Sequence, residues 1–156
     1  MMLKMPNVVI ADTSCLIILC NINELDILQK LYHQITTTPD VANEYGDPLP
    51  EWIIVTSPSD IQKQHILELQ VDKGEASAIA LALEIHDSLI ILDDLEGRIL
   101  AKQLNLQITG TIGVLVKAKL KGIIPSIKPL LNKIKQTNFR ISPLIETAAL
   151  KESGEL

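Results

Sequence analysis

Acidic side chains stand inside or at the end of apolar segments, with almost no basic residue nearby, at Asp12, Glu44, Glu75 and the pair Asp93–Asp94. Carboxylates in such surroundings are costly unless something neutralises them. Hard divalent cations prefer carboxylate and water oxygens, and Mg²⁺ or Mn²⁺ held by acids is the usual means of chemistry on phosphate esters. The acids therefore indicate a Mg²⁺ or Mn²⁺ site that acts on phosphate.

Two of these acidic positions directly follow short apolar runs. Val8–Ala11 and Ser88–Leu92 have the pattern of strands covered on both faces. Strand and helix patterns alternate along the chain, which predicts a parallel sheet with right-handed crossovers and helices on both faces. Ligands of such sheets gather at the carboxyl ends of the strands, so Asp12 and Asp93–Asp94 are expected to meet in one crevice.

Glu44 and Glu75 are predicted to lie on helices. The Thr38–Pro39 pair reads as an N-cap followed by proline in the first turn, and Gly46 as a stop signal, so Glu44 falls on a short helix. The strongest helical pattern of the chain begins beside Glu75. On that helix Glu75 shares a side with the apolar Ile79, so it is expected to point inward.

Each acid also has an ordinary structural interpretation. Asp12 could cap the helix that follows it, and Asp72 and Glu75 have the spacing of a capping box. Glu44 could be a surface acid on its helix. One member of the pair Asp93–Asp94 could simply cap the next helix. No single position therefore decides the function.

Taken together, the acidic motifs resemble, in order and spacing, those of PIN-domain ribonucleases. The matching segments are Val8–Ser14, Pro39–Glu44, Gly74–Ala82 and Ile91–Asp94. Two further segments, Thr109–Leu115 and the tail Ile123–Pro143, look like one toxin-like bacterial branch of that superfamily. The resemblance covers essentially the whole chain. It implies that residues 1–156 form a single domain with a three-layer α/β/α fold around a central, mainly parallel sheet.

The resemblance also implies a set of site residues. The catalytic, metal-binding acids would be Asp12, Glu44, Glu75 and Asp94, with Asp93 as a supporting or alternative ligand. Ser14 stands at the hydroxyl position beside the first acid. Thr111 begins a helix, where it could help hold phosphate or could only cap that helix.

Two departures from the common family pattern affect this assignment. Common members have Asp where this chain has Glu75, so the metal would lie about one methylene further from that helix. The last motif is often followed by an aromatic residue, which this chain lacks there. The alignment therefore favours Asp94 as the ligand but leaves Asp93 open.

The activity implied is a metal-dependent endoribonuclease that hydrolyses RNA phosphodiester bonds. One or two Mg²⁺ or Mn²⁺ ions would lower the pKa of a water molecule, orient it toward a phosphorus atom and stabilise charge on the leaving oxygen. Many relatives are toxins that pair with a small antitoxin protein. We expect RNA and such an antitoxin as partners, a homodimer as the assembly, and a cytoplasmic location.

Charge is distributed unevenly along the chain. The net charge of −5 by itself argues against nucleic acid, but residues 1–96 carry 4 Lys/Arg and 16 Asp/Glu, whereas residues 97–145 carry 9 Lys/Arg and no acid. This basic segment could follow an RNA backbone, or its residues could be ordinary solvated helix faces. The candidate RNA-binding residues are Arg98, Lys102, Lys117, Lys119 and Lys121.

Two other function classes are open at this stage. A phosphatase or phosphotransferase would use Asp12 as a nucleophile, but such sites usually carry a second acid two residues later, where this chain has Ser14. An inactive module would keep the fold alone, although clustered carboxylates would then raise one another's pKa at a cost in stability. No apolar run reaches the roughly 18 residues that a membrane span needs. Cys15 and Cys20 fit a reducing compartment.

Overall fold

The computed structural model describes residues 5–156. Strands and helices alternate up to the last strand, and three helices complete the chain. The elements are β1 (Val8–Ala11), α1 (Thr13–Asn21), α2 (Asp26–Tyr32), β2 (Ile35–Thr37), α3 (Pro39–Tyr45), β3 (Ile53–Val55), α4 (Ile61–Leu67), α5 (Lys73–Glu84), β4 (Ser88–Ile91), α6 (Leu95–Gln103), β5 (Gln107–Thr109), α7 (Thr111–Leu120), α8 (Lys128–Lys135) and α9 (Pro143–Ser153).

The strands form one sheet in the order β3-β2-β1-β4-β5, and every pairing within the described residues is parallel. The chain adds β2 and β3 on one side of β1 and then returns to add β4 and β5 on the other. The direction of winding therefore reverses between β1 and β4, where Val8 lies opposite Ser88 and Ala11 opposite Ile91. In open α/β sheets the crevice at such a reversal is the usual ligand site.

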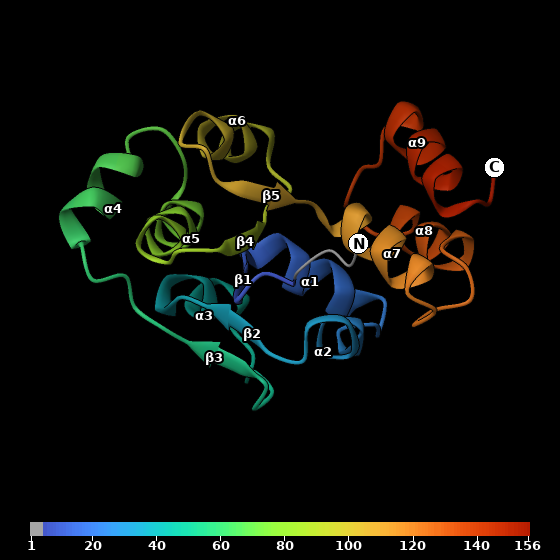
Figure 1. Cartoon of the computed structure of the whole chain (residues 1–156), viewed down its shortest axis with the longest axis horizontal. Coiled ribbons are helices and arrows are strands. Elements are labelled where there is room, and N and C mark those ends of the chain that lie inside the picture. The colour runs from blue at the N-terminus through green and yellow to red at the C-terminus, as the bar shows by residue number, and fades with distance from the viewer. Residues whose placement is uncertain (1–4) are drawn as a thin grey trace.

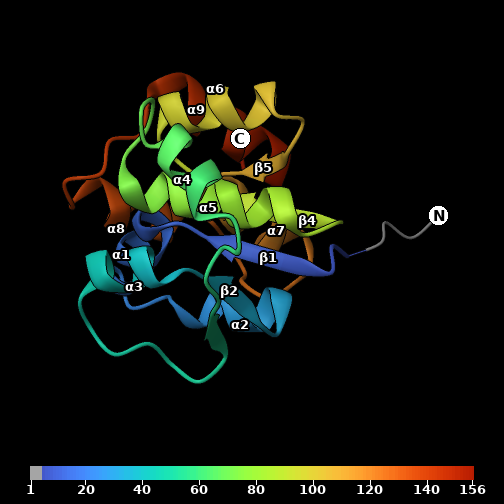
Figure 2. The same cartoon turned by 90° about the vertical axis from the view of Figure 1, so that its left-hand side faces the viewer.

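Helices cover both faces of the sheet (Figures 1 and 2). Because side chains alternate along a strand, Val9 and Ala11 of β1 enter one core while Ile10 enters the other. The first core is built mainly with α1, α2, α7 and α8, and the second mainly with α5 and α6. These three layers confirm the predicted α/β/α fold with its parallel sheet.

Local signals in the sequence account for several of the helix boundaries. Thr38 caps α3 by accepting a hydrogen bond from the Val41 amide at 3.2 Å, and Gly46 ends the helix in the left-handed conformation with a φ of 83°. Strand β2 was not predicted, because its Ile35–Thr37 sequence is short and gives little alternation. Its position beside β1 is fixed instead by the tertiary fold, including a bond from the Thr37 hydroxyl to the Ala11 carbonyl at 2.8 Å.

The C-terminal helices pack beside α7, away from β2 and β3 (Figure 1). Lys119 of α7 donates to the Ser153 carbonyl at 3.1 Å and pairs with Glu155 at 3.5 Å. Glu155 in turn accepts the Ile127 amide at 2.8 Å, at the start of α8. These bonds join three helices at one point. No helix within residues 5–156 is both long and apolar enough to cross a bilayer.

Candidate active site

Asp12 directly follows β1, at the reversal point of the sheet. Its backbone amide continues the sheet by donating to the Ile91 carbonyl at 3.1 Å. Its side chain is only 3% exposed and, although Asp12 occupies the N-cap position of α1, it does not cap the helix. The Oδ1 atom is buried and has no hydrogen-bond partner within residues 5–156. A buried, unsatisfied carboxylate oxygen is rare in folded proteins and indicates a missing partner.

Glu44 reaches the same region from the end of α3. Its carboxylate accepts one hydrogen bond from the Thr13 hydroxyl at 2.7 Å and another from the Gly74 amide at 3.0 Å. Each carboxylate oxygen therefore has a donor, from α1 on one side and from α5 on the other. Glu44 is exposed, as a surface acid would be, but these two donors orient its carboxylate.

Glu75 points inward from the first turn of α5, and the residue is 6% exposed. It forms a capping box with Asp72, in which the Glu75 amide donates to Asp72 at 2.8 Å and the Asp72 amide donates to Glu75 Oε2 at 3.3 Å. The capping and inward interpretations of Glu75 are thus both correct. A single carboxylate completes the helix start and faces the acidic cluster.

Asp93 follows β4, next to Asp12 in the sheet order. Both of its oxygens are bonded to Thr111, Oδ1 to the backbone amide at 2.8 Å and Oδ2 to the hydroxyl at 2.6 Å. The Thr111 contacts come from the first residue of α7, after β5. Thr111 therefore holds Asp93 in place.

Asp94 and Ser14 have other surroundings. Asp94 caps α6 by accepting a hydrogen bond from the Gly97 amide at 3.3 Å, and it is exposed. Ser14 is partly exposed on α1. The hydroxyl that contacts an acid in this part of α1 is that of Thr13, not Ser14. The role of Ser14 beside the first acid stays a prediction.

Several of the acids lie near enough to raise one another's pKa. Burial, together with the smaller effects of the charges of Asp72, Glu44 and Asp93, raises the pKa of Asp12 to about 7, while the Thr13 amide lowers it. Burial likewise raises the pKa of Glu75 to about 8, with contributions from Asp72, Asp94 and Asp12. Clustered carboxylates destabilise one another's charged forms unless a cation is present.

The pKa of Asp93 is raised as well. Its pKa is raised by burial, while the hydroxyl and amide of Thr111 and the nearby Arg98 oppose that effect. The charge of Asp93 raises the pKa of Asp12, and the charge of Asp94 raises the pKa of Glu75. The two adjacent aspartates therefore reach different members of the cluster.

The candidate ligands have the chemistry that a hard divalent cation prefers, but they do not form a complete coordination shell. All candidate ligands are carboxylates, which Mg²⁺ and Mn²⁺ prefer, and Asp12 Oδ1 lacks a partner in the part of the chain that the structure describes. Within residues 5–156, however, no three acidic, histidine or cysteine side chains lie close enough together to form a ready metal-binding group. Mg²⁺ usually keeps several waters and takes one or two carboxylates directly, so the set fits a partly hydrated ion.

A cleft of about 640 Å³ begins at Asp93 and runs between β5, α6, α7 and α9. Its walls are mainly apolar and include Phe139, Ile112 and the exposed Ile145. Arg98 and Arg140 also line it. Arg98 Nη1 donates to the Leu92 carbonyl at 2.8 Å, which fixes one guanidinium beside the acidic cluster.

The other candidate RNA-binding residues lie in different environments. Lys102 is exposed near the end of α6. Lys117 lies 5.4 Å from the centre of the Tyr32 ring, and burial lowers its pKa. Lys119 is bonded to Ser153 and Glu155, and Lys121 contacts the Met5 sulfur at 3.3 Å. Since a helix rises about 1.5 Å per residue, Lys121 lies roughly 15 Å along α7 from Thr111.

Sequence reasoning missed Thr13 and Asp72 as members of the site. Thr13 orients Glu44, and Asp72 raises the pKa of both Asp12 and Glu75. The sequence carried a signal for each, because Thr13 adjoins Asp12 and Asp72 has capping-box spacing to Glu75. Neither signal shows which other acid the residue will meet, because that depends on how α1, α3 and α5 pack.

A parallel α/β/α fold with acids at the reversal of its sheet is the arrangement expected of a metal-assisted nuclease. Comparison with protein families agrees: a family model described as a PIN domain matches residues 8–155. The chain belongs to the PIN-domain family, whose members are generally nucleases. No curated protein and no solved structure matches the chain significantly.

Proposed function

We propose that this protein is a metal-dependent endoribonuclease that hydrolyses RNA phosphodiester bonds. The observation that carries the proposal is the buried Asp12 carboxylate at the sheet reversal. One of its oxygens has no partner among residues 5–156, and burial, with smaller contributions from nearby acids, raises its pKa to about 7. Family membership supports the nuclease class. The choice of RNA as substrate rests on the motif resemblance.

Each acid has a distinct role in this proposal. Asp12, Glu44, Glu75 and the pair Asp93–Asp94 would hold Mg²⁺ or Mn²⁺, whose bound form supplies a water of lowered pKa and neutralises charge on the reacting phosphate. Asp12 offers the free oxygen, and Glu44 is already oriented by two donors. Asp93 lies near enough to Asp12, and Asp94 near enough to Glu75, for each charge to raise the pKa of its neighbour.

The supporting residues position these acids. Thr111 holds both oxygens of Asp93, and Thr13 holds Glu44. Arg98 and Arg140 line the cleft that begins at Asp93, where cationic side chains would meet the RNA backbone. Lys102, Lys117, Lys119 and Lys121 are proposed to extend this contact along α6 and α7.

The proposal is tested by the substitution Asp12→Asn. We expect RNA cleavage with Mg²⁺ or Mn²⁺ to fall by at least about 100-fold, because the variant keeps the shape of the side chain but loses a charged ligand. The matched control is Asp47→Asn, an exposed acid in the loop after α3. Cleavage is measured on single-stranded and structured RNA with purified protein.

Two results would reject the mechanism. One is undiminished cleavage in excess chelator, from a preparation shown to be free of other nucleases. The other is an Asp12→Asn variant as active as the Asp47→Asn control. Cleavage of DNA in preference to RNA would keep the metal-dependent nuclease and change its substrate.

The alternative functions have separate tests. A phosphatase that uses Asp12 as nucleophile would accumulate a phosphoenzyme, which acid quenching would trap. Against it, Asp12 is 3% exposed and its pKa of about 7 leaves part of the population protonated near neutrality. An inactive nucleic-acid-binding module would bind RNA with no cleavage under any metal condition.

The biological setting is proposed from the resemblance alone. A toxin role would require a small antitoxin, and co-expression with an adjacent small reading frame should then give a stable complex and suppress RNA cleavage. We also propose that the chain works as a single domain, assembles as a homodimer and acts in the cytoplasm. Sedimentation of the purified protein tests the assembly.

A further inference from the structure

Gly74 occupies a position where glycine is not needed for backbone conformation. It is the second residue of α5, and it is not among the glycines with positive φ, which are Gly46, Gly122 and Gly154. Glycine is among the weakest helix formers, and alanine would be favoured at an ordinary helical position. The absence of a side chain at residue 74 therefore has another cause.

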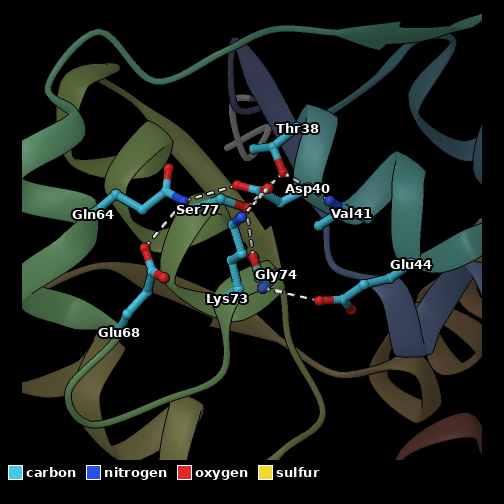
Figure 3. A network of polar contacts seen from close by, with 9 residues as sticks. All are labelled: Thr38, Asp40, Val41, Glu44, Gln64, Glu68, Lys73, Gly74 and Ser77. Carbon is cyan, nitrogen blue, oxygen red and sulfur yellow. Dashed lines mark hydrogen bonds and ion pairs between the residues drawn. The ribbon is translucent and has the colours of Figure 1, made fainter.

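The space that a Gly74 side chain would fill is occupied by the Glu44 carboxylate. A Cβ built on Gly74 would lie 2.5 Å from Glu44 Oε1 and 2.7 Å from Oε2, well inside van der Waals contact. The Gly74 amide meanwhile donates to Oε1 at 3.0 Å, a bond drawn in Figure 3. The glycine thus both admits and binds this carboxylate.

A polar network links α3 to α5 and to α4 (Figure 3). The hydroxyls of Thr38 and Ser77 lie 2.6 Å apart in a buried contact, and the Ser77 hydroxyl donates to the Gly74 carbonyl at 2.7 Å. Asp40 pairs with Lys73 at 3.6 Å and accepts from the buried Gln64 at 2.8 Å. A side chain at residue 74 would consequently displace Glu44 rather than the helix.

We propose that Gly74 is a positioning residue that sets the location of the Glu44 carboxylate in the acidic cluster. The inference rests on the proposed function only where it concerns metal. The steric part depends on the α3–α5 packing alone. The inference predicts that the change in stability caused by a methyl group at residue 74 depends on which residue occupies position 44.

The first experiment is a double-mutant cycle on thermal unfolding in chelator, with the parent, Gly74→Ala, Glu44→Ala and the double variant. When position 44 is alanine, Gly74→Ala should raise Tm by roughly 2–4 °C, because the contact is gone and helix propensity improves. With Glu44 present, the same change should give no gain or lower Tm. Equal Tm changes in both backgrounds would overturn the inference.

The second experiment measures Mn²⁺ binding by calorimetry. Gly74→Ala should weaken Mn²⁺ affinity by roughly 10- to 100-fold, as for other residues that orient metal ligands. Glu44→Asp should weaken it when residue 74 is glycine but should partly restore it when residue 74 is alanine, because the shorter side chain withdraws from the added methyl group. Weakening by Glu44→Asp in both backgrounds would contradict the positioning role.

The two experiments separate the inference from the function. If the parent binds no Mn²⁺, the metal-dependent mechanism fails while the Tm cycle still decides whether Gly74 positions Glu44. If Mn²⁺ binds and the Tm cycle shows no coupling, the nuclease proposal stands and the role of Gly74 is rejected.

Discussion

At the scale of single residues, Asp12 and Asp93 follow neighbouring strands yet have opposite surroundings. Both oxygens of Asp93 are held by Thr111, whereas Asp12 keeps a buried oxygen without a partner in the described chain. The Asp93 carboxylate is thus fixed by the protein, whereas the Asp12 carboxylate keeps an oxygen available to a ligand. That difference makes Asp12 the most informative position for substitution.

The raised pKa values predict how the metal-free protein responds to pH. The Asp12 and Glu75 carboxyls have pKa values of about 7 and about 8, above their ordinary values of 3.8 and 4.5. Their protonated forms favour the folded state. The stability they contribute is therefore full below about pH 4 and is lost as pH rises to about 8. Urea unfolding in chelator should show this fall.

Asp12→Asn should remove the part of this pH dependence that belongs to Asp12. Because each pKa unit corresponds to about 1.4 kcal/mol, the variant should gain a few kcal/mol over the parent between about pH 4 and pH 8. Mg²⁺ or Mn²⁺ should stabilise the parent more than the variant at pH 8. A constant difference in unfolding free energy across this range would show that Asp12 titrates normally.

Residue-level reasoning from the sequence predicted the inward direction of Glu75 but not how Glu44 is held. The inward direction of Glu75 followed from its helical spacing to Ile79, and the structure agrees. The clamp on Glu44 could not be predicted, because Thr13 and Gly74 lie 31 and 30 residues away from it in the chain. Such contacts depend on helix packing, which local patterns do not specify.

At the scale of elements, α7, α8 and α9 are joined through Glu155. Its carboxylate accepts hydrogen bonds from the Ser126 hydroxyl and the Ile127 amide at the start of α8, and pairs with Lys119 of α7. These donors, led by Ser126, lower the pKa of Glu155 to about 2. A carboxylate near a helix start is favourable because the first amides lack partners within the helix.

Glu155→Gln should therefore lower Tm near neutral pH. Since the folded pKa of about 2 lies below the ordinary 4.5, the stabilisation by Glu155 is present above about pH 4.5 and is lost as pH falls toward 2. The Tm difference between parent and variant should shrink across that window. Glu152→Gln, an exposed change on α9, is the control and should show no comparable trend.

Elements were predictable where a local signal defined their ends. Thr38 and Gly46 bracket α3, and Asp72 starts α5 through its capping box. Helix α5 begins earlier than its apolar pattern suggested, at Lys73, because its cap precedes the first apolar turn. Strand β2 has no such signal and depends on its neighbours.

At the scale of the whole molecule, the acidic cluster and the three lysines of α7 and its C-cap lie at opposite ends of that helix. Thr111 begins the helix beside Asp93, while Lys117, Lys119 and Lys121 lie toward its end. Arg98 and Arg140 stand closer to the acids, in the cleft that opens at Asp93. RNA that reaches the cluster would have to be attracted by this uneven distribution of charge.

We predict that neutralising Lys117, Lys119 and Lys121 together weakens RNA binding and flattens its salt dependence. Each lost phosphate contact should remove roughly one unit or slightly less from the logarithmic salt slope. A variant with only Lys117→Gln and Lys121→Gln is needed beside it, because Lys119 also secures Ser153 and Glu155. Mn²⁺ binding should not change.

Arg140→Gln provides the comparison within the cleft, and Lys133→Gln on α8 provides an exposed basic control outside it. If both α7 variants keep the affinity and salt slope of the parent while Arg140→Gln loses affinity, RNA follows the cleft and not the end of α7. Equal losses in Lys133→Gln and the test variants would indicate nonspecific attraction.

The parallel pairing of β1 with β4 also determines when the site can exist. Val8 can pair only after Ser88, 80 residues further along the chain, has been synthesised. Asp93 is oriented only after Thr111 has been added. Parallel pairings over such separations form late because the intervening chain must first be closed into a loop. A chain still on the ribosome, or one cut short before Thr111, carries every acid of the proposed site without their arrangement. Premature products of translation should therefore be inert toward the RNA around them.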